Sequence, residues 1–123
     1  MAFLTDRKRV DGLGSAREGT RHFWSMTVTS VALLILVPMF LFCVGPLWGE
    51  PHEDVIAGLS RPFTAIITAL MLGVGFHHFR LGVQTLIEDY VRGVARKIWI
   101  VVMTLVSYGL AASGLVALAQ IAL

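Results

Sequence analysis

The central segment of the chain, residues 75–91, reads GFHHFRLGVQTLIEDYV. Three ionisable side chains, His77, His78 and Arg80, interrupt an apolar run that otherwise extends from about residue 63 to residue 87. Such side chains cost several kcal/mol at the depth of a bilayer, so they are rare there and are usually functional. The segment therefore predicts a membrane-spanning helix that carries a functional site.

The composition places this helix in a polytopic membrane protein. Of 123 residues, 56% are hydrophobic and only 15% are charged, whereas soluble domains carry about 25% charged residues. A further apolar run lies on each side of the central one, and a span needs only about 20 apolar residues. We predict an all-α integral membrane protein whose N-terminal arm, residues 1–22, precedes a single three-helix membrane domain, residues 23–123. The predicted helices are at about 23–47, 62–88 and 97–122.

The basic residues predict the orientation of these helices. The arm holds five Lys or Arg residues and the second loop three, whereas the first loop holds only Arg61. Basic loops stay in the cytoplasm. We therefore expect a multi-pass protein of the bacterial inner membrane, with a cytoplasmic N-terminus, a cytoplasmic second loop and a periplasmic C-terminus.

Four small or polar residues form a stripe on the central helix. His78, Gly82, Thr85 and Asp89 are spaced four, three and four apart, so at about 100° per residue they share one face. Such a face on a membrane helix turns toward protein or cofactor rather than lipid. Gly82 leaves room for a flat group one turn from His78, and imidazole is a common ligand of haem iron. His78 is thus a candidate haem ligand, with a packing residue or a proton path as alternatives.

The rest of a haem site is incomplete in this chain. His77 lies about 100° from His78 on the helix, and we expect it to be a packing neighbour. The first helix offers only His22 at its edge, and the third offers no histidine. A second axial ligand must then come from another subunit, so the chain is expected to be half of a haem-binding helical bundle. Arg80 is a candidate partner for a haem propionate because its long side chain can reach toward the interface.

Residues 78–91 closely resemble the signature of the succinate dehydrogenase hydrophobic membrane anchor subunit, a cytochrome b anchor. That signature is His-x-x-x-Gly-x-Gln followed by (Glu/Thr)-Asp-Tyr-Val. The stretch GSAREGTRHFW at residues 14–24 is similar to the opening of the alphaproteobacterial and mitochondrial-like members. The chain departs from the family at Thr27, where an arginine is expected.

The resemblance implies a subunit of succinate:ubiquinone oxidoreductase, respiratory complex II, without activity of its own. It implies that His78 is an axial ligand of haem b and that a second, partner anchor subunit supplies the other. It further implies that Tyr90 hydrogen-bonds a ubiquinone carbonyl and that Asp89 serves the proton supply of that site. Electrons would arrive from succinate through a flavoprotein subunit and an iron–sulfur subunit on the cytoplasmic side. Membrane lipid completes the expected partners, and no nucleic acid is expected.

Two other classes of function remain open from the residues alone. A small transporter or proton-relay subunit would use the histidine stripe without haem, and a purely structural anchor would use the helices only for packing. Glu88, Asp89 and Tyr90 would then mark the membrane boundary, where tyrosine is common. Gly109 and Ser113 form a small-xxx-small pair, which favours close helix packing on the third helix.

Overall fold

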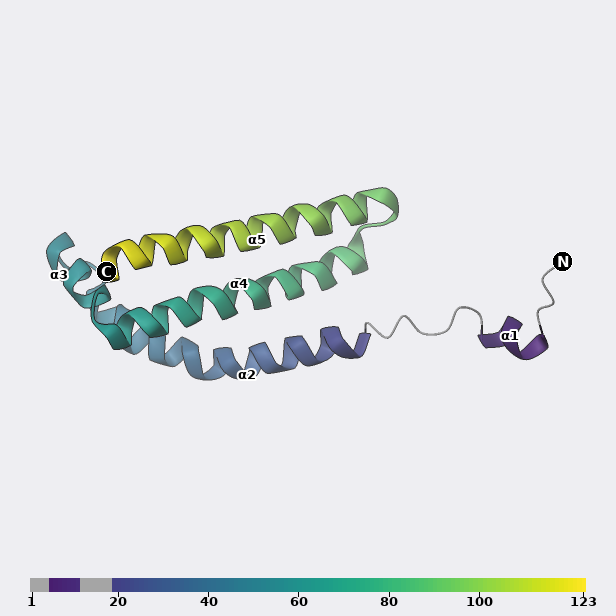
Figure 1. Cartoon of the computed structure of the whole chain (residues 1–123), viewed down its shortest axis with the longest axis horizontal. Helices are drawn as coiled ribbons and strands as arrows, with labels where there is room; N and C mark the ends of the chain where they lie inside the picture. Colours follow the sequence, from purple (N-terminus) through teal and green to yellow (C-terminus); the bar gives the residue numbers. More distant parts are fainter. Residues whose placement is uncertain (1–4, 12–18) are drawn as a thin grey trace.

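The computed structural model describes residues 5–11 and 19–123, and within them it is helical without any strand (Figure 1). Of the N-terminal motif at residues 14–24, residues 14–18 lie outside the described residues. The elements in chain order are α1 (Asp6–Asp11), α2 (Gly19–Val44), the 3-10 turn η1 (Gly45–Leu47), α3 (His52–Leu59), α4 (Pro62–Tyr90) and α5 (Gly93–Ala122).

Three of these segments are long and apolar enough to cross a membrane, which confirms the predicted all-α fold with three transmembrane helices. The spans are Gly19–Leu47, Pro62–Tyr90 and Gly93–Ala122, of 29, 29 and 30 residues. At 1.5 Å per residue each helix is about 45 Å long, more than the ~30 Å of bilayer hydrocarbon. The helices therefore extend into the interfacial regions at their ends.

The helix ends differ from those expected because polar residues continue a helix beyond its apolar part. α2 begins at Gly19 rather than near residue 23, and α5 begins at Gly93 rather than near residue 97. Only Val91 and Arg92 separate α4 from α5. Arg92 is extended and Gly93 has a φ of +68°, a left-handed conformation that glycine adopts without steric cost.

Helix α4 is the centre of the bundle. It packs along both α2 and α5, whereas α2 and α5 scarcely contact each other (Figure 1). The N-terminus of α2 lies at the same end of the bundle as the turn between α4 and α5, and α3 and the C-terminus lie at the other end (Figure 1). Helix α4 therefore lies between α2 and α5 along the bundle.

Small residues make the contact between α4 and α5. Ser107 is fully buried, Ala111 is buried one turn later, and a Cβ on Gly114 would lie 3.2 Å from Leu72 Cδ1 of α4. Gly109 is exposed, with nothing within 4 Å of a Cβ there. The predicted close-packing pair is therefore wrong within this chain, and the contact uses a neighbouring face of α5.

Helix α3 was not expected from the sequence. It follows Pro51 and carries Glu53 and Asp54 in its first turn, where negative charge interacts favourably with the helix dipole. Gly58 of α3 packs so closely that a Cβ there would lie 2.5 Å from Leu47 Cδ2. The segment between α2 and α4 is thus a folded cap on that end of the bundle.

Candidate functional site

The polar stripe of α4 faces α2. His78 Nδ1 lies 2.8 Å from Thr29 Oγ1, and His22 Nε2 lies 3.1 Å from Thr85 Oγ1. The two pairs are seven residues apart on each helix, as two turns of antiparallel helices require. Two of the four predicted stripe residues, His78 and Thr85, therefore join the central helix to α2.

Hydroxyl groups near the start of α2 bond to their own helix. Thr27 donates to Phe23 O at 2.9 Å and Ser30 donates to Met26 O at 2.8 Å. Such back-bonding is common for threonine and serine inside helices. Thr27, which stands where an arginine was expected, is thus satisfied locally, and the structure gives it no contact with α4 of the kind Thr29 has.

Open space borders His78 along the helix. Gly75 precedes it by three residues and Gly82 follows it by four, so both lie near its face of α4. A Cβ added to either glycine would meet nothing within 4 Å. His78 is half-buried, and within residues 5–11 and 19–123 its Nε2 makes no hydrogen bond. The arrangement suits a flat group, because His78 offers one nitrogen as a ligand and the two glycines leave the helix surface beside it smooth.

The other two intramembrane ionisable residues face α5. His77 Nδ1 lies 3.0 Å from Tyr108 Oη, with the two rings stacked at a centroid distance of 6.3 Å. Arg80 Nε donates a 3.4 Å hydrogen bond to Thr104 Oγ1. His77 is therefore held by a partner within the chain, and Arg80 lies on a different side of α4 from His78.

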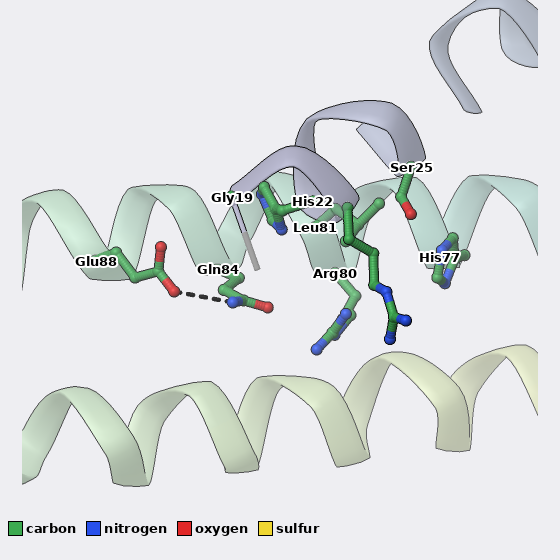
Figure 2. A pocket seen from close by; sticks show the side chains of 9 residues that line it. Gly19, His22, Ser25, His77, Arg80, Leu81, Gln84 and Glu88 are labelled. Atoms are coloured by element: carbon green, nitrogen blue, oxygen red, sulfur yellow. Dashed lines mark hydrogen bonds between the residues drawn. The ribbon is translucent and has the colours of Figure 1, made fainter. Parts of the chain in front are cut away.

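A pocket of about 470 Å³ lies beside these residues, at the end of the bundle where α2 begins and α4 ends. Figure 2 shows His22 and Ser25 entering it from α2, and Arg80 on α4 extending toward α5. The lining residues are Gly19, Arg21, His22, Ser25, His77, Arg80, Leu81, Gln84 and Glu88.

The pocket carries more positive than negative side chains. Arg21 and Arg80 both line it, whereas Glu88 is the single carboxylate among its described lining residues and accepts a 2.8 Å hydrogen bond from Gln84 Nε2 (Figure 2). Gln84 Oε1 is buried without a hydrogen-bond partner in the described part of the chain. An anionic group is favoured in the pocket, and a buried acceptor of this kind needs a donor from elsewhere.

Asp89 and Tyr90 are not part of this pocket. Both lie in the last turn of α4, where Asp89 is exposed and Tyr90 is 81% exposed. Within the described residues neither side chain has a hydrogen bond or ion pair. The structure does not bring them together with His78 and Arg80, and both are free to contact another molecule at the end of the helix.

Four features of this region were not predicted from the sequence: Arg21, Thr29, Gln84 and the pairing of Thr85 with His22. A seven-residue spacing recurs in the first and second helices, between His22 and Thr29 and between His78 and Thr85. The shared spacing could have indicated that the polar faces of these two helices pack against each other. Within the described ranges no three His, Cys, Asp or Glu side chains gather to hold a metal ion.

Comparison with known proteins identifies relatives over most of the chain. The family model for the succinate dehydrogenase/fumarate reductase transmembrane subunit matches residues 4–112. The chain is 42% identical to a succinate dehydrogenase hydrophobic membrane anchor subunit from Paracoccus denitrificans, over 100% of this chain and 95% of that protein. A protein of the same description from Rickettsia bellii is 25% identical over 72% of this chain and 71% of its own length.

No solved structure matches the chain. The family match covers most of the sequence, and three helices of the structure can span a membrane. The chain therefore belongs to the succinate dehydrogenase/fumarate reductase transmembrane subunit family, as a membrane anchor subunit of succinate dehydrogenase.

Proposed function

We propose that this chain supplies one axial ligand of haem b and part of the ubiquinone-reduction site in succinate:ubiquinone oxidoreductase. The observation that carries the haem assignment is the environment of His78. One ring nitrogen is held by Thr29 and the other makes no hydrogen bond within the described residues, beside two glycines that leave open space. Metal-binding histidines almost always engage their second nitrogen in a hydrogen bond of this kind.

The partner anchor subunit supplies the second axial ligand. Neither remaining histidine on α2 or α4 shares the site of His78, since His22 lies two turns away along α2, beside Thr85, and His77 faces Tyr108 of α5. When bound, the haem supplies a one-electron carrier within the membrane. Arg80 is the proposed partner of a haem propionate by its charge: its hydrogen bond to Thr104 uses only Nε and leaves the rest of the guanidinium available, although the side chain faces α5 rather than the side of His78.

Asp89 and Tyr90 act on the quinone, whose reduction to quinol consumes two electrons and two protons. The phenolic O–H of Tyr90 donates a hydrogen bond to one carbonyl oxygen and stabilises the negative charge that develops there. Asp89 takes up protons from water and delivers them to the quinone, whose two carbonyl oxygens each accept one. The exposure of both side chains at the end of α4 supports this role, because a second subunit and the substrate can reach them.

The same end of the bundle faces the soluble subunits. The basic arm leads into α2 at this end, and Arg92 lies in the turn between α4 and α5; basic segments of this kind stay in the cytoplasm. The N-terminus is therefore cytoplasmic and the C-terminus periplasmic in the bacterial inner membrane. The iron–sulfur subunit docks at this end and passes electrons from the flavoprotein subunit. The anchor chain alone has no activity.

The dithionite-reduced optical spectrum of the purified complex tests the haem assignment. His78→Ala abolishes the b-type α-band, whereas the adjacent His77→Ala, which loses its hydrogen bond and ring contact with Tyr108, keeps it. An α-band that survives in His78→Ala refutes ligation. It would favour a haem-free proton relay or a structural anchor instead.

Succinate–quinone reductase assays test the quinone assignment separately. Tyr90→Phe lowers quinone turnover about tenfold or more, as expected for the loss of a hydrogen bond to a developing charge. Reduction of a soluble artificial acceptor is unchanged. The chain's other tyrosine gives the control, Tyr108→Phe, which keeps quinone turnover. Full turnover and full sensitivity to quinone-site inhibitors in Tyr90→Phe would exclude the role.

A further inference from the structure

The contact between His78 and Thr29 determines which nitrogen of His78 carries hydrogen. Thr29 Oγ1 lies 2.7 Å from Ser25 O, 3.1 Å from Met26 O and 2.8 Å from His78 Nδ1. A hydroxyl has one hydrogen to donate, and a carbonyl oxygen has none. The three contacts therefore cannot all be made by Thr29 as the donor.

The short contact with Ser25 O determines which atom donates in each of these hydrogen bonds. Two oxygens 2.7 Å apart need a hydrogen between them, and only Thr29 can supply it, since Ser25 O is a backbone carbonyl. The hydroxyl hydrogen of Thr29 is thus used within α2, and its lone pair faces His78. His78 Nδ1 must then be the donor of the 2.8 Å hydrogen bond.

A neutral imidazole that carries hydrogen on Nδ1 has its lone pair on Nε2. We propose that Thr29 is a positioning residue, which holds His78 as the Nδ1–H tautomer and so presents Nε2 as the iron ligand. This inference rests on the proposed haem function and adds a residue of the first helix to it. Hydrogen bonds of this kind to metal ligands fix the ring orientation and raise the donor strength of the free nitrogen.

The neighbouring hydroxyl groups of α2 provide matched controls. Thr27 back-bonds to Phe23 O as Thr29 does to Ser25 O, but among the described residues it has no contact with a histidine. Thr27→Val therefore removes a back-bonded hydroxyl alone. Thr29→Val removes the same group together with the acceptor for His78, in a side chain of the same shape. Thr29→Ser keeps the acceptor.

The test uses the assembled, detergent-purified complex. Thr29→Val is expected to lose haem to excess apomyoglobin about tenfold faster than the wild type, in line with the effect of removing an outer partner of a metal ligand. Its haem midpoint potential is expected to rise, because a weaker imidazole donor stabilises ferric iron less. Thr29→Ser and Thr27→Val are expected to match the wild type in both measurements.

The outcomes separate this inference from the proposed function. If His78→Ala loses the α-band but Thr29→Val keeps wild-type haem retention and potential, the role of Thr29 is refuted and the haem assignment stands. If His78→Ala retains the α-band, both fall. If Thr27→Val changes as much as Thr29→Val, the effect comes from helix α2 itself and the positioning role is refuted.

Discussion

The open space at Gly82 allows us to predict how the size of a side chain beside His78 affects assembly and haem binding. A Cβ at this position would meet nothing within 4 Å, so Gly82→Ala introduces no clash within the chain. Alanine is favoured over glycine inside a helix by about 0.5–1 kcal/mol. Gly82→Ala is therefore expected to assemble at least as well as the wild type.

A larger side chain at the same position gives the opposite result for the cofactor. Gly82→Leu places a bulky group one turn from His78, on the face that we assign to the haem. Overfilling a packed site costs about 1–3 kcal/mol, which corresponds to roughly a 5- to 150-fold loss of haem affinity. The chain itself is expected to fold normally, because none of its described residues occupies that space.

The haem-to-protein ratio of the purified complex measures this effect. Gly73→Leu is the control: it adds the same side chain to α4, five residues from His78 and thus about 140° around the helix. Gly73 is likewise open, with nothing within 4 Å of a Cβ. Wild-type haem content in Gly82→Leu, or an equal loss in both variants, would refute the assignment of this face to the haem.

Three further predictions concern the pocket, the helix contact and the orientation. Arg80→Gln is expected to lower the haem midpoint potential, because it removes positive charge near the propionates, while Arg80→Lys keeps it; a potential unchanged in Arg80→Gln would contradict the pairing. Ser107 is fully buried and, within the described residues, its hydroxyl bonds only to Met103 O. Ser107→Val is therefore expected to destabilise the complex by about 1–3 kcal/mol in thermal unfolding, whereas Ser107→Ala changes the stability by less than about 1 kcal/mol; equal stability of the two would contradict the tight contact. A periplasm-dependent phosphatase fused after Leu123 is expected to be active, and one fused after Arg92 inactive, and the reverse pattern would overturn the orientation.

The membrane fold was predictable because lipid leaves the backbone few choices. A span must satisfy its own hydrogen bonds, so three long apolar runs imply three helices. Their ends were not predictable from hydropathy, since α2 and α5 begin in polar sequence at Gly19 and Gly93. Helix α3 was missed for a related reason: its signals, Pro51 and two acidic residues, are short and local.

The residues that share a face of α4 were predictable from their spacing, but the helix that this face packs against was not. The spacing of His78 and Thr85 identified one face of α4, yet only the structure shows that this face meets α2. The sequence also places His78 and Arg80 two residues apart, which is about 200° around a helix. In the structure Arg80 accordingly extends toward α5, whereas His78 faces α2. The two side chains therefore lie on different sides of α4 although they are close in sequence.

Asp89 and Tyr90 remain predictions because their surroundings lie beyond this chain. They are exposed at the end of α4, outside the pocket. A site shared between subunits leaves only half of its contacts in either one.

Chemical rescue of His78→Gly most directly tests the claim that His78 binds haem iron. Removing the side chain next to open space leaves room for a free imidazole, since Gly75 and Gly82 already border the site. We predict that the purified His78→Gly complex lacks the b-type α-band and that added imidazole restores it. Restoration should not occur with added 2-methylimidazole, whose methyl group crowds the ligating nitrogen. A His78→Gly complex that keeps its α-band without imidazole would contradict the account.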